Sequence, residues 1–358
     1  MSPFVDAFKK NRSGFMGVDI GMRRLHLLEF SGSEQPCVSG FGSASIADHA
    51  VIDDRVADID AVGDSVKQAL HRSGIGSRRA ALAVAGPAVI SKMVELPAGL
   101  GDAEIEEQIH YDAAAYISHP IEELHLDFRI VESDPSNPDI NRVMLAACRR
   151  DTVASYIDAL AKGGISVAIV DLASAALENA CGLLVGDIPA AQVLTNRAVF
   201  DVRAEYTRLT VQHRGKSVYS RELTLATQQL TDLLVAQHDV LNEDDLFGQL
   251  RAGAISASMI ADKVADFAAD AARQIEQALQ FFTSAAAFDE TIDEVVIVGD
   301  IGLLPGSERA LGEHLNRPFR LGNPIANMSA SSAAKDKNVE WYGPALSVAS
   351  GLAIRAVR

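Results

Sequence analysis

The sequence predicts an α/β fold built from two related units. Patterns typical of strands and helices alternate along its 358 residues, and 48% of these are hydrophobic, as in ordinary globular proteins. Two segments, "FMGVDIGMRRLHLLEF" and "AVFDVRAEYTRLTVQ", share a further pattern: an apolar strand that ends in Asp, a short turn and a second strand. A duplicated hairpin of this kind favours two internally related domains that face a cleft.

Apolar periodicity and helix-end signals in the first half of the chain predict several strands and three helices. An amphipathic helix near 55–73 closes at Gly74, and a second helix opens at Asp102 with an acidic first turn that suits its positive end. A third helix near 149–162 ends at Gly163-Gly164. The strands are expected near 15–20, 24–30, 79–84, 89–97, 124–132 and 142–147.

The strand "ISVAIVD" and the Ala-rich helix "LASAALENACGLL" are expected to end the first unit. A second α/β unit follows, with a strand "DEVVIVGD" and a helix after Pro305 near its end. Its other elements are strands near 196–202, 205–213 and 216–221, and helices near 222–236, 242–251, 257–287 and 343–357.

Composition excludes several classes of function. The formal net charge of −16 argues against nucleic acid or an anionic membrane as the main partner, because both attract clustered Lys and Arg. The three cysteines are odd in number and far apart, so they suggest neither a disulfide framework nor a zinc site. No apolar segment has the length of a signal peptide or of a membrane span. We expect a soluble cytosolic protein that could dock on a membrane protein.

Three carboxylates end predicted strands: Asp19, Asp171 and Asp201. In α/β sheets ligands gather at the carboxyl ends of strands, where carboxylates can hold Mg²⁺ through its waters and turns admit phosphate oxygens. Gly299 and Gly302 in "VVIVGDIGLLPG" offer a further place for phosphate or base. Each feature has an ordinary alternative: a single Asp can be a turn residue or helix cap, and a Gly can serve a tight turn.

These elements, in this order, resemble the actin, Hsp70 and sugar kinase superfamily. Within it the chain is similar to the PilM family of type IV pilus proteins. The most specific match is "AVAGPAVISKMVELPAGLGDAEIEEQIHYDAAAYISHPIEELHLDFRIV", followed by "VMLAACRRDTVASYIDALAKGGISVAIVDLASAALENA". It continues through "YSRELTLATQQL", "LGNPIANM" and the terminal "GLAIR", and so covers nearly the whole chain.

The resemblance implies an actin-like, two-lobed fold related to the cell-division protein FtsA. The first lobe would span 14–185, with a small inserted subdomain at about 85–165 and a C-terminal helix, 343–358, that returns to it. The second lobe would span 195–335, with a small helical subdomain at about 222–256.

The resemblance also implies a function. Proteins of the PilM family bind the cytoplasmic N-terminal peptide of the membrane protein PilN, bind ATP or ADP, and help couple the pilus complex to its motors. Carried over by position, Asp19 and Gly21 would lie in the first phosphate loop, Asp201 in the second and Asp171 near Mg²⁺. Gly299 and Gly302 would line the adenosine pocket, and the partner would bind in or beside the 85–165 subdomain.

Four departures fall on the nucleotide-facing loops. Met22-Arg23-Arg24 replaces small hydroxyl residues and His26 a lysine; Val202-Arg203 follows Asp201 in place of Ile-Gly; Ala226-Thr227 and Asp300 replace glycines. We expect weak or absent ATP binding and essentially no hydrolysis. Alternatively, Arg23 or Arg203 could pair with phosphates, or the arginines could lie on a solvated turn.

The sequence therefore predicts a pilus scaffold at the inner membrane, held there by a protein partner. The competing hypothesis is an enzyme of the same superfamily, such as a small-molecule kinase, which would need intact phosphate loops and a base aimed at a substrate hydroxyl.

Overall fold

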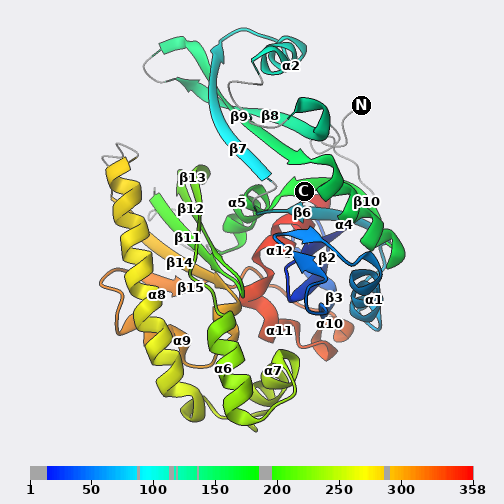
Figure 1. The fold of residues 1–358 in the computed structure, drawn as a ribbon, viewed down its shortest axis with the longest axis vertical. Coiled ribbons are helices and arrows are strands. Elements are labelled where there is room, and N and C mark those ends of the chain that lie inside the picture. Colours follow the sequence, from blue (N-terminus) through cyan, green and yellow to red (C-terminus); the bar gives the residue numbers. More distant parts are fainter. Residues whose placement is uncertain are drawn as a thin grey trace.

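A computed structural model describes residues 14–86, 89–112, 117, 120–134, 137–184, 196–285 and 291–357. Two five-stranded mixed sheets form its centre (Figure 1). The first, in the order β10-β6-β1-β2-β3, contains β1 (Met16–Ile20), β2 (Arg24–Ser31), β3 (Cys37–Ser45), β6 (Arg79–Val84) and β10 (Ser166–Leu172). The second, in the order β13-β12-β11-β14-β15, contains β11 (Asn196–Val202), β12 (Thr207–His213), β13 (Lys216–Leu223), β14 (Glu294–Gly299) and β15 (Phe319–Leu321).

The two sheets have the same strand directions. In each, the central strand pairs antiparallel with the next strand of its hairpin and parallel with a later strand, β6 or β14. The hairpins also share a register, since Asp19 lies opposite His26 and Asp201 opposite Arg208. The repeated sequence pattern therefore corresponds to two equivalent hairpins, β1–β2 and β11–β12.

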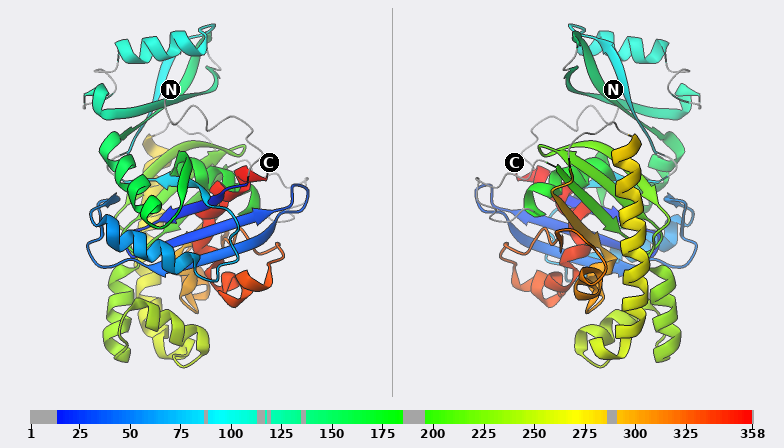
Figure 2. Two further views of the ribbon diagram at one scale, coloured as in Figure 1. Left: turned by 90° about the vertical axis from the view of Figure 1, so that its right-hand side faces the viewer. Right: turned by 90° about the vertical axis from the view of Figure 1, so that its left-hand side faces the viewer.

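A third, three-stranded sheet is inserted between β6 and β10. It contains β7 (Val89–Pro97), β8 (Leu124–Asp134) and β9 (Asn137–Arg149), with β9 in the middle. Helix α2 (Asp102–Tyr111) covers one face through a shared apolar cluster that includes Ile105, Ile109, Val143 and Leu145. This sheet projects away from the rest of the molecule in all three views (Figures 1 and 2).

Helix α4 (Arg150–Lys162) returns the chain to the first sheet, where it packs against α1 (Ile59–Leu70) and β10. The prediction included α4 in the inserted subdomain at 85–165, whereas the inserted sheet with α2 spans 89–149. Asp58 caps α1 by accepting a hydrogen bond from Ala61 N at 3.0 Å, so this helix begins later than the predicted residue 55. Residues Arg55–Val56 form a short strand, β5, instead.

Helix α12 (Ser347–Ala353) packs against α5 (Ala173–Leu184) and β1. The continuous helix predicted over 343–357 is divided into η5 (Gly343–Leu346), α12 and η6 (Ile354–Ala356). In the second half, α8 (Ala257–Ala285) runs along the second sheet, and α6 (Gln228–His238) and α7 (Glu243–Ala252) lie at the end far from the inserted sheet (Figure 1). The remaining elements are β4 (Val51–Ile52), η2 (Ile121–Glu123), η4 (Asp300–Leu303), α9 (Ser307–Gly312), α10 (Ser332–Asp336) and α11 (Val339–Tyr342).

The largest buried cluster joins the two halves of the molecule. It combines Leu28 and Phe41 of the first sheet with Phe200 of the second and Ile275 of α8. Of the helices in the described part of the chain, not one combines the length and apolar character needed to cross a bilayer.

Candidate functional site

A small cavity of about 30 Å³ lies where the turns of the two equivalent hairpins meet. Charged side chains from both sheets and from α7 surround it. Its lining residues are Asp19, Gly21, Met22, Arg23, Arg24, His26, Asp201, Arg203, Ala204, Glu205, Glu243, Phe247, Gly299, Asp300 and Ala345.

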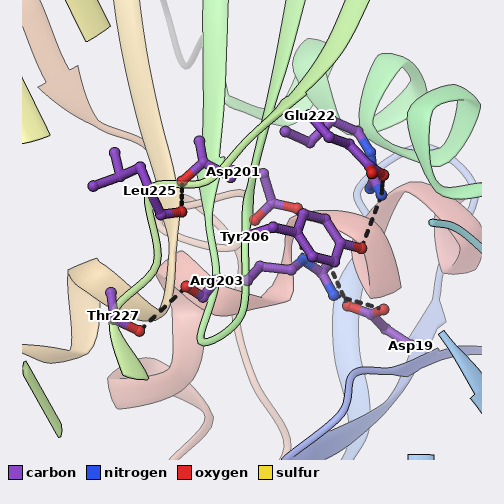
Figure 3. Close-up of polar contacts among 9 residues, drawn as sticks. Asp19, Asp201, Arg203, Tyr206, Glu222, Leu225 and Thr227 are labelled. Carbon is purple, nitrogen blue, oxygen red and sulfur yellow. Dashed lines mark hydrogen bonds and ion pairs between the residues drawn. The ribbon is translucent and has the colours of Figure 1, made fainter. Parts of the chain in front are cut away.

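Arg203 connects the two hairpins at this point (Figure 3). Its Nη2 donates to Asp19 Oδ2 at 2.8 Å, its Nη1 to Asp19 Oδ1 at 3.2 Å, and its Nε to Asp201 Oδ2 at 2.8 Å. The side chains of Arg203, Asp19 and Asp201 are only 14%, 6% and 2% exposed. Burial alone would lower the pKa of Arg203, but Asp19 and Asp201 raise it well above its ordinary value, so the guanidinium stays charged.

Backbone geometry explains why Arg203 points into the cleft. Gly21 N donates to Arg24 O at 2.9 Å in the first turn, and Arg203 N donates to Tyr206 O at 3.0 Å in the second. Arg203 therefore occupies the position in its hairpin that Gly21 occupies in the other. From this position the Arg203 side chain reaches the carboxylates near the ends of β1 and β11.

Thr227 stabilises the turn between β11 and β12 through two hydrogen bonds to its backbone. Its backbone N–H donates to Arg203 O at 2.9 Å, and its Oγ1 donates to the same oxygen at 3.3 Å (Figure 3). Gln228 N donates to Ala204 O at 2.9 Å. The start of α6 thus holds the turn that carries Arg203, at the place where the family resemblance expects two glycines.

The arginines of the first turn pair with the helices of the second half. Arg23 Nη1 donates to Asp232 Oδ1 of α6 at 2.9 Å. Arg24 is buried, forms an ion pair with Asp244 of α7 and lies 3.9 Å from Glu243 Oε2. Carboxylates of α6 and α7 are therefore the partners of both arginines in this structure, and a phosphate-binding role for Arg23 stays a prediction.

His26 is buried between two aromatic rings, those of Phe41 and Tyr342, at centroid distances of 6.3 and 5.7 Å. Burial and the charges of Arg24 and Arg203 lower its pKa well below the ordinary value. The imidazole is therefore neutral at physiological pH and supplies no positive charge where the resemblance expects a lysine.

Two further carboxyls share the cavity. Burial raises the pKa of Asp300 to about 7, with Glu243 adding to the shift, and burial raises the pKa of Glu205 to about 7, with Asp300 adding to it. Among the described residues, Glu205 Oε1 has no hydrogen-bond partner. These groups add negative charge to the cleft as the pH rises through neutrality.

The structure brings together four of the six residues that the sequence singled out for a nucleotide. Asp19, Gly21, Asp201 and Gly299 line the cavity. Gly299 has φ of 96°, and a Cβ there would lie 2.4 Å from Val202 O, so the turn requires glycine.

The other two residues have different surroundings. Gly302 lies against Pro344, since a Cβ there would approach the Pro344 Cβ to 2.3 Å. Asp171 forms an ion pair with Arg355 of η6 and accepts a hydrogen bond from Leu172 N at 2.8 Å. Neither residue is part of the cavity lining.

A Mg²⁺-nucleotide does not fit the residues present. A cavity of about 30 Å³ compares with about 300 Å³ or more for ordinary ligand pockets. The lining carries three arginines and five carboxylates, so its balance of charge opposes a triphosphate. The carboxylates Asp19 and Asp201, which their places at strand ends predict to hold Mg²⁺ through its waters, already bind Arg203.

Sequence reasoning missed the acidic partners of this site. Asp232 lies on α6, and Glu243 and Asp244 lie in the first turn of α7, where acids are common because they suit the helix dipole. Glu205 stands at the first position of the strand predicted over 205–213. Nothing in the local sequence distinguishes them, because their role depends on the approach of segments about two hundred residues apart.

The duplicated sheet, with its two equivalent hairpins facing a cleft, defines an actin-like protein. One solved chain of this fold, described as a PilM-PilN type IV pilus biogenesis complex, is 23% identical with a TM-score of 0.77, matched over 97% of this chain and 100% of that one. Another, the ethanolamine utilization protein EutJ from Carboxydothermus hydrogenoformans, is 15% identical with a TM-score of 0.52, over 98% and 95%. The family described as type IV pilus assembly protein PilM matches residues 17–357, and the chain belongs to this family. The predicted fold class and family are confirmed.

Proposed function

We propose that this chain is a scaffold of the type IV pilus assembly machinery that binds the cytoplasmic N-terminal peptide of a PilN-like inner-membrane protein. Membership of the PilM family over residues 17–357 is the observation that carries the proposal. The solved relative described as a PilM-PilN complex supports the choice of partner. In this proposal the protein is cytoplasmic, peripheral at the inner membrane through that partner, and able to contact other platform or motor proteins.

The inserted sheet offers a surface for the partner. Helix α2 covers the face that carries Val143 and Leu145, while the alternate residues Met93 and Met144 lie opposite each other on the other face and are half-buried. Methionine side chains adapt their shape to apolar ligands, and an edge strand such as β7 can add main-chain hydrogen bonds. A short extended peptide suits such a surface.

A half-buried glutamate joins this surface to the rest of the molecule. Glu178 of α5 accepts a hydrogen bond from Arg129 Nη1 of β8 at 3.3 Å and one from Ser217 N of β13 at 3.0 Å. Arg129 lies opposite Met144 in the sheet register. A peptide beside Met144 would therefore lie near a contact shared by the inserted sheet, α5 and the second sheet.

The charge of the inserted segment favours a basic peptide. Residues 89–149 contain twelve acidic and four basic side chains, a net charge of −8 out of −16 for the whole chain. Cytoplasmic segments that flank membrane spans are rich in Lys and Arg. Attraction between the two would speed their encounter and would weaken as salt is added.

The competing function, an ATP-consuming enzyme, has less support. Phosphoryl transfer needs a positively charged, preorganised phosphate site, whereas Arg203 is bound by Asp19 and Asp201 and the cavity is net negative. We propose that the protein acts without catalytic turnover and binds ATP or ADP weakly or not at all.

Calorimetric titration with the cytoplasmic N-terminal peptide of a PilN-like protein from the same organism tests the proposal. We expect saturable binding by the full chain, weakened about tenfold or more by Met144→Asp, which places an unpaired charge at the proposed contact. Met259→Asp is the matched control, because Met259 is 50% exposed at the start of α8, far from the inserted sheet (Figure 1). Absence of binding by folded protein, or equal losses in both variants, would contradict the proposal.

A further inference from the structure

We propose that Arg203 is a built-in cation that keeps the two halves of the protein closed on each other without any nucleotide or metal. The actin-like fold implies a nucleotide between the two hairpins, whereas charged side chains of this chain occupy that place.

Arg203 lies between two buried carboxylates, Asp19 and Asp201. Asp19 and Asp201 lie near the ends of equivalent strands, and both carboxylates contact the Arg203 guanidinium. Two buried carboxylates so close need a cation between them, since like charges in a poorly hydrated site repel strongly. Arg203 provides it, with two hydrogen bonds to Asp19 and one to Asp201. A guanidinium suits this place, because its N–H donors have a fixed planar arrangement that matches two carboxylates and because it stays charged.

The contact between Arg203 and Asp19 crosses from one sheet to the other. Asp19 belongs to the first sheet, and Arg203 belongs to the turn between β11 and β12 of the second. The bond therefore crosses the cleft directly, at the point where a bound nucleotide would otherwise contact both hairpins. Arg203 stands where the equivalent β1–β2 turn has Gly21, and its side chain fills the space between the hairpins.

Two further arginines also connect the two halves of the molecule. Arg23 pairs with Asp232 of α6, and Arg24 pairs with Asp244 of α7 and lies 5.5 Å from the ring centroid of Phe247. All three arginines join the 14–86 segment to the 196–285 segment. Closure is thus a property of the folded chain, in contrast to a protein whose lobes close when a ligand binds both.

Hydrogen–deuterium exchange of the full chain tests the inference. In the wild type we expect slow exchange of the amides at 19–26 and 201–208 without added ligand, and no change with Mg-ATP. In Arg203→Ala we expect both segments to exchange about tenfold faster or more, while β8 and β9 keep their wild-type rates. Methylguanidinium, which restores the missing cation, should slow the exchange again.

Arg309→Ala is the matched control, because Arg309 forms an exposed pair with Glu313 on α9 and should leave both segments unchanged. Should Arg203→Ala lose its fold by circular dichroism, Arg203→Lys replaces it: an ammonium keeps the charge without the fork, so intermediate exchange is expected. Wild-type exchange rates in the folded variant, or added protection of the wild-type hairpins by Mg-ATP, would overturn the inference.

Discussion

Arg23 and Arg24 are neighbours in the first hairpin, yet their surroundings differ. Arg23 pairs with a half-exposed carboxylate, whereas Arg24 is buried between α7 and Tyr342 and lies 5.8 Å from the centroid of that ring. Exposed ion pairs contribute little to stability, because water already solvates both charges. Removal of one partner of a buried pair leaves the other charge without compensation.

The same substitution at these two positions should therefore have unequal effects. We expect Arg24→Ala to lower the free energy of unfolding by about 3 kcal/mol, and Arg23→Ala by about 1 kcal/mol or less. Urea denaturation followed by circular dichroism measures both. Equal losses would show that the burial of Arg24 does not matter.

Asp300 gives the site a pH dependence. Burial raises its pKa to about 7, above the ordinary value near 4, so between these values the folded state binds more protons than the unfolded one. Stability from this group is present at low pH and is lost as the pH rises through 7. Asp300→Asn, which is neutral throughout, should stabilise the protein by about 1 to 3 kcal/mol at pH 8 and have little effect near pH 4.

Thermal unfolding across pH 4 to 9 tests this expectation, with Glu308→Gln on the exposed side of α9 as control. A pH-independent effect of Asp300→Asn would indicate that packing, and not ionisation, determines its influence.

At this scale the sequence predicted the acids and glycines of the hairpins but not what they contact. Asp19, Asp201 and Gly299 could be found because they end apolar strands. The bond between Asp19 and Arg203 joins residues 184 positions apart, and a single sequence contains no signal for it.

At the scale of elements, prediction succeeded where apolar periodicity is strong and failed where small residues weaken it. The hairpin strands and the long helix α8 lie close to their expected ranges. β3, "CVSGFGSAS", was missed because glycine and serine dilute its pattern, and β15 has only three residues. The lobe and subdomain boundaries inferred from the family resemblance stay a prediction.

Two glycines in different elements should respond in opposite ways to the same change. Gly302→Ala would bring a methyl group within 2.3 Å of the Pro344 Cβ, and we expect a loss of about 1 to 3 kcal/mol. Gly248 lies within α7 with no atom near its missing Cβ, so Gly248→Ala should add about 0.5 to 1 kcal/mol through helix propensity. Chemical denaturation of both variants checks the signs, and a stable Gly302→Ala would mean that η4 and η5 can move apart.

At the scale of the whole molecule, the actin-like architecture is retained, and in our proposal side chains take the place of the nucleotide. The buried cluster that includes Leu28 and Phe200 joins the two halves, and Arg203 closes the cleft above it. The inserted sheet projects from this closed body and carries half of the net charge (Figure 2). This division suggests a rigid platform that presents one acidic surface to a basic peptide.

Peptide binding with and without nucleotide tests this account most directly. Calorimetry of the full chain with the PilN-like N-terminal peptide should give the same dissociation constant in buffer, with Mg-ATP and with Mg-ADP, because the cleft is already closed. Saturable binding of Mg-ATP itself, or a peptide affinity that appears only when nucleotide is present, would contradict it.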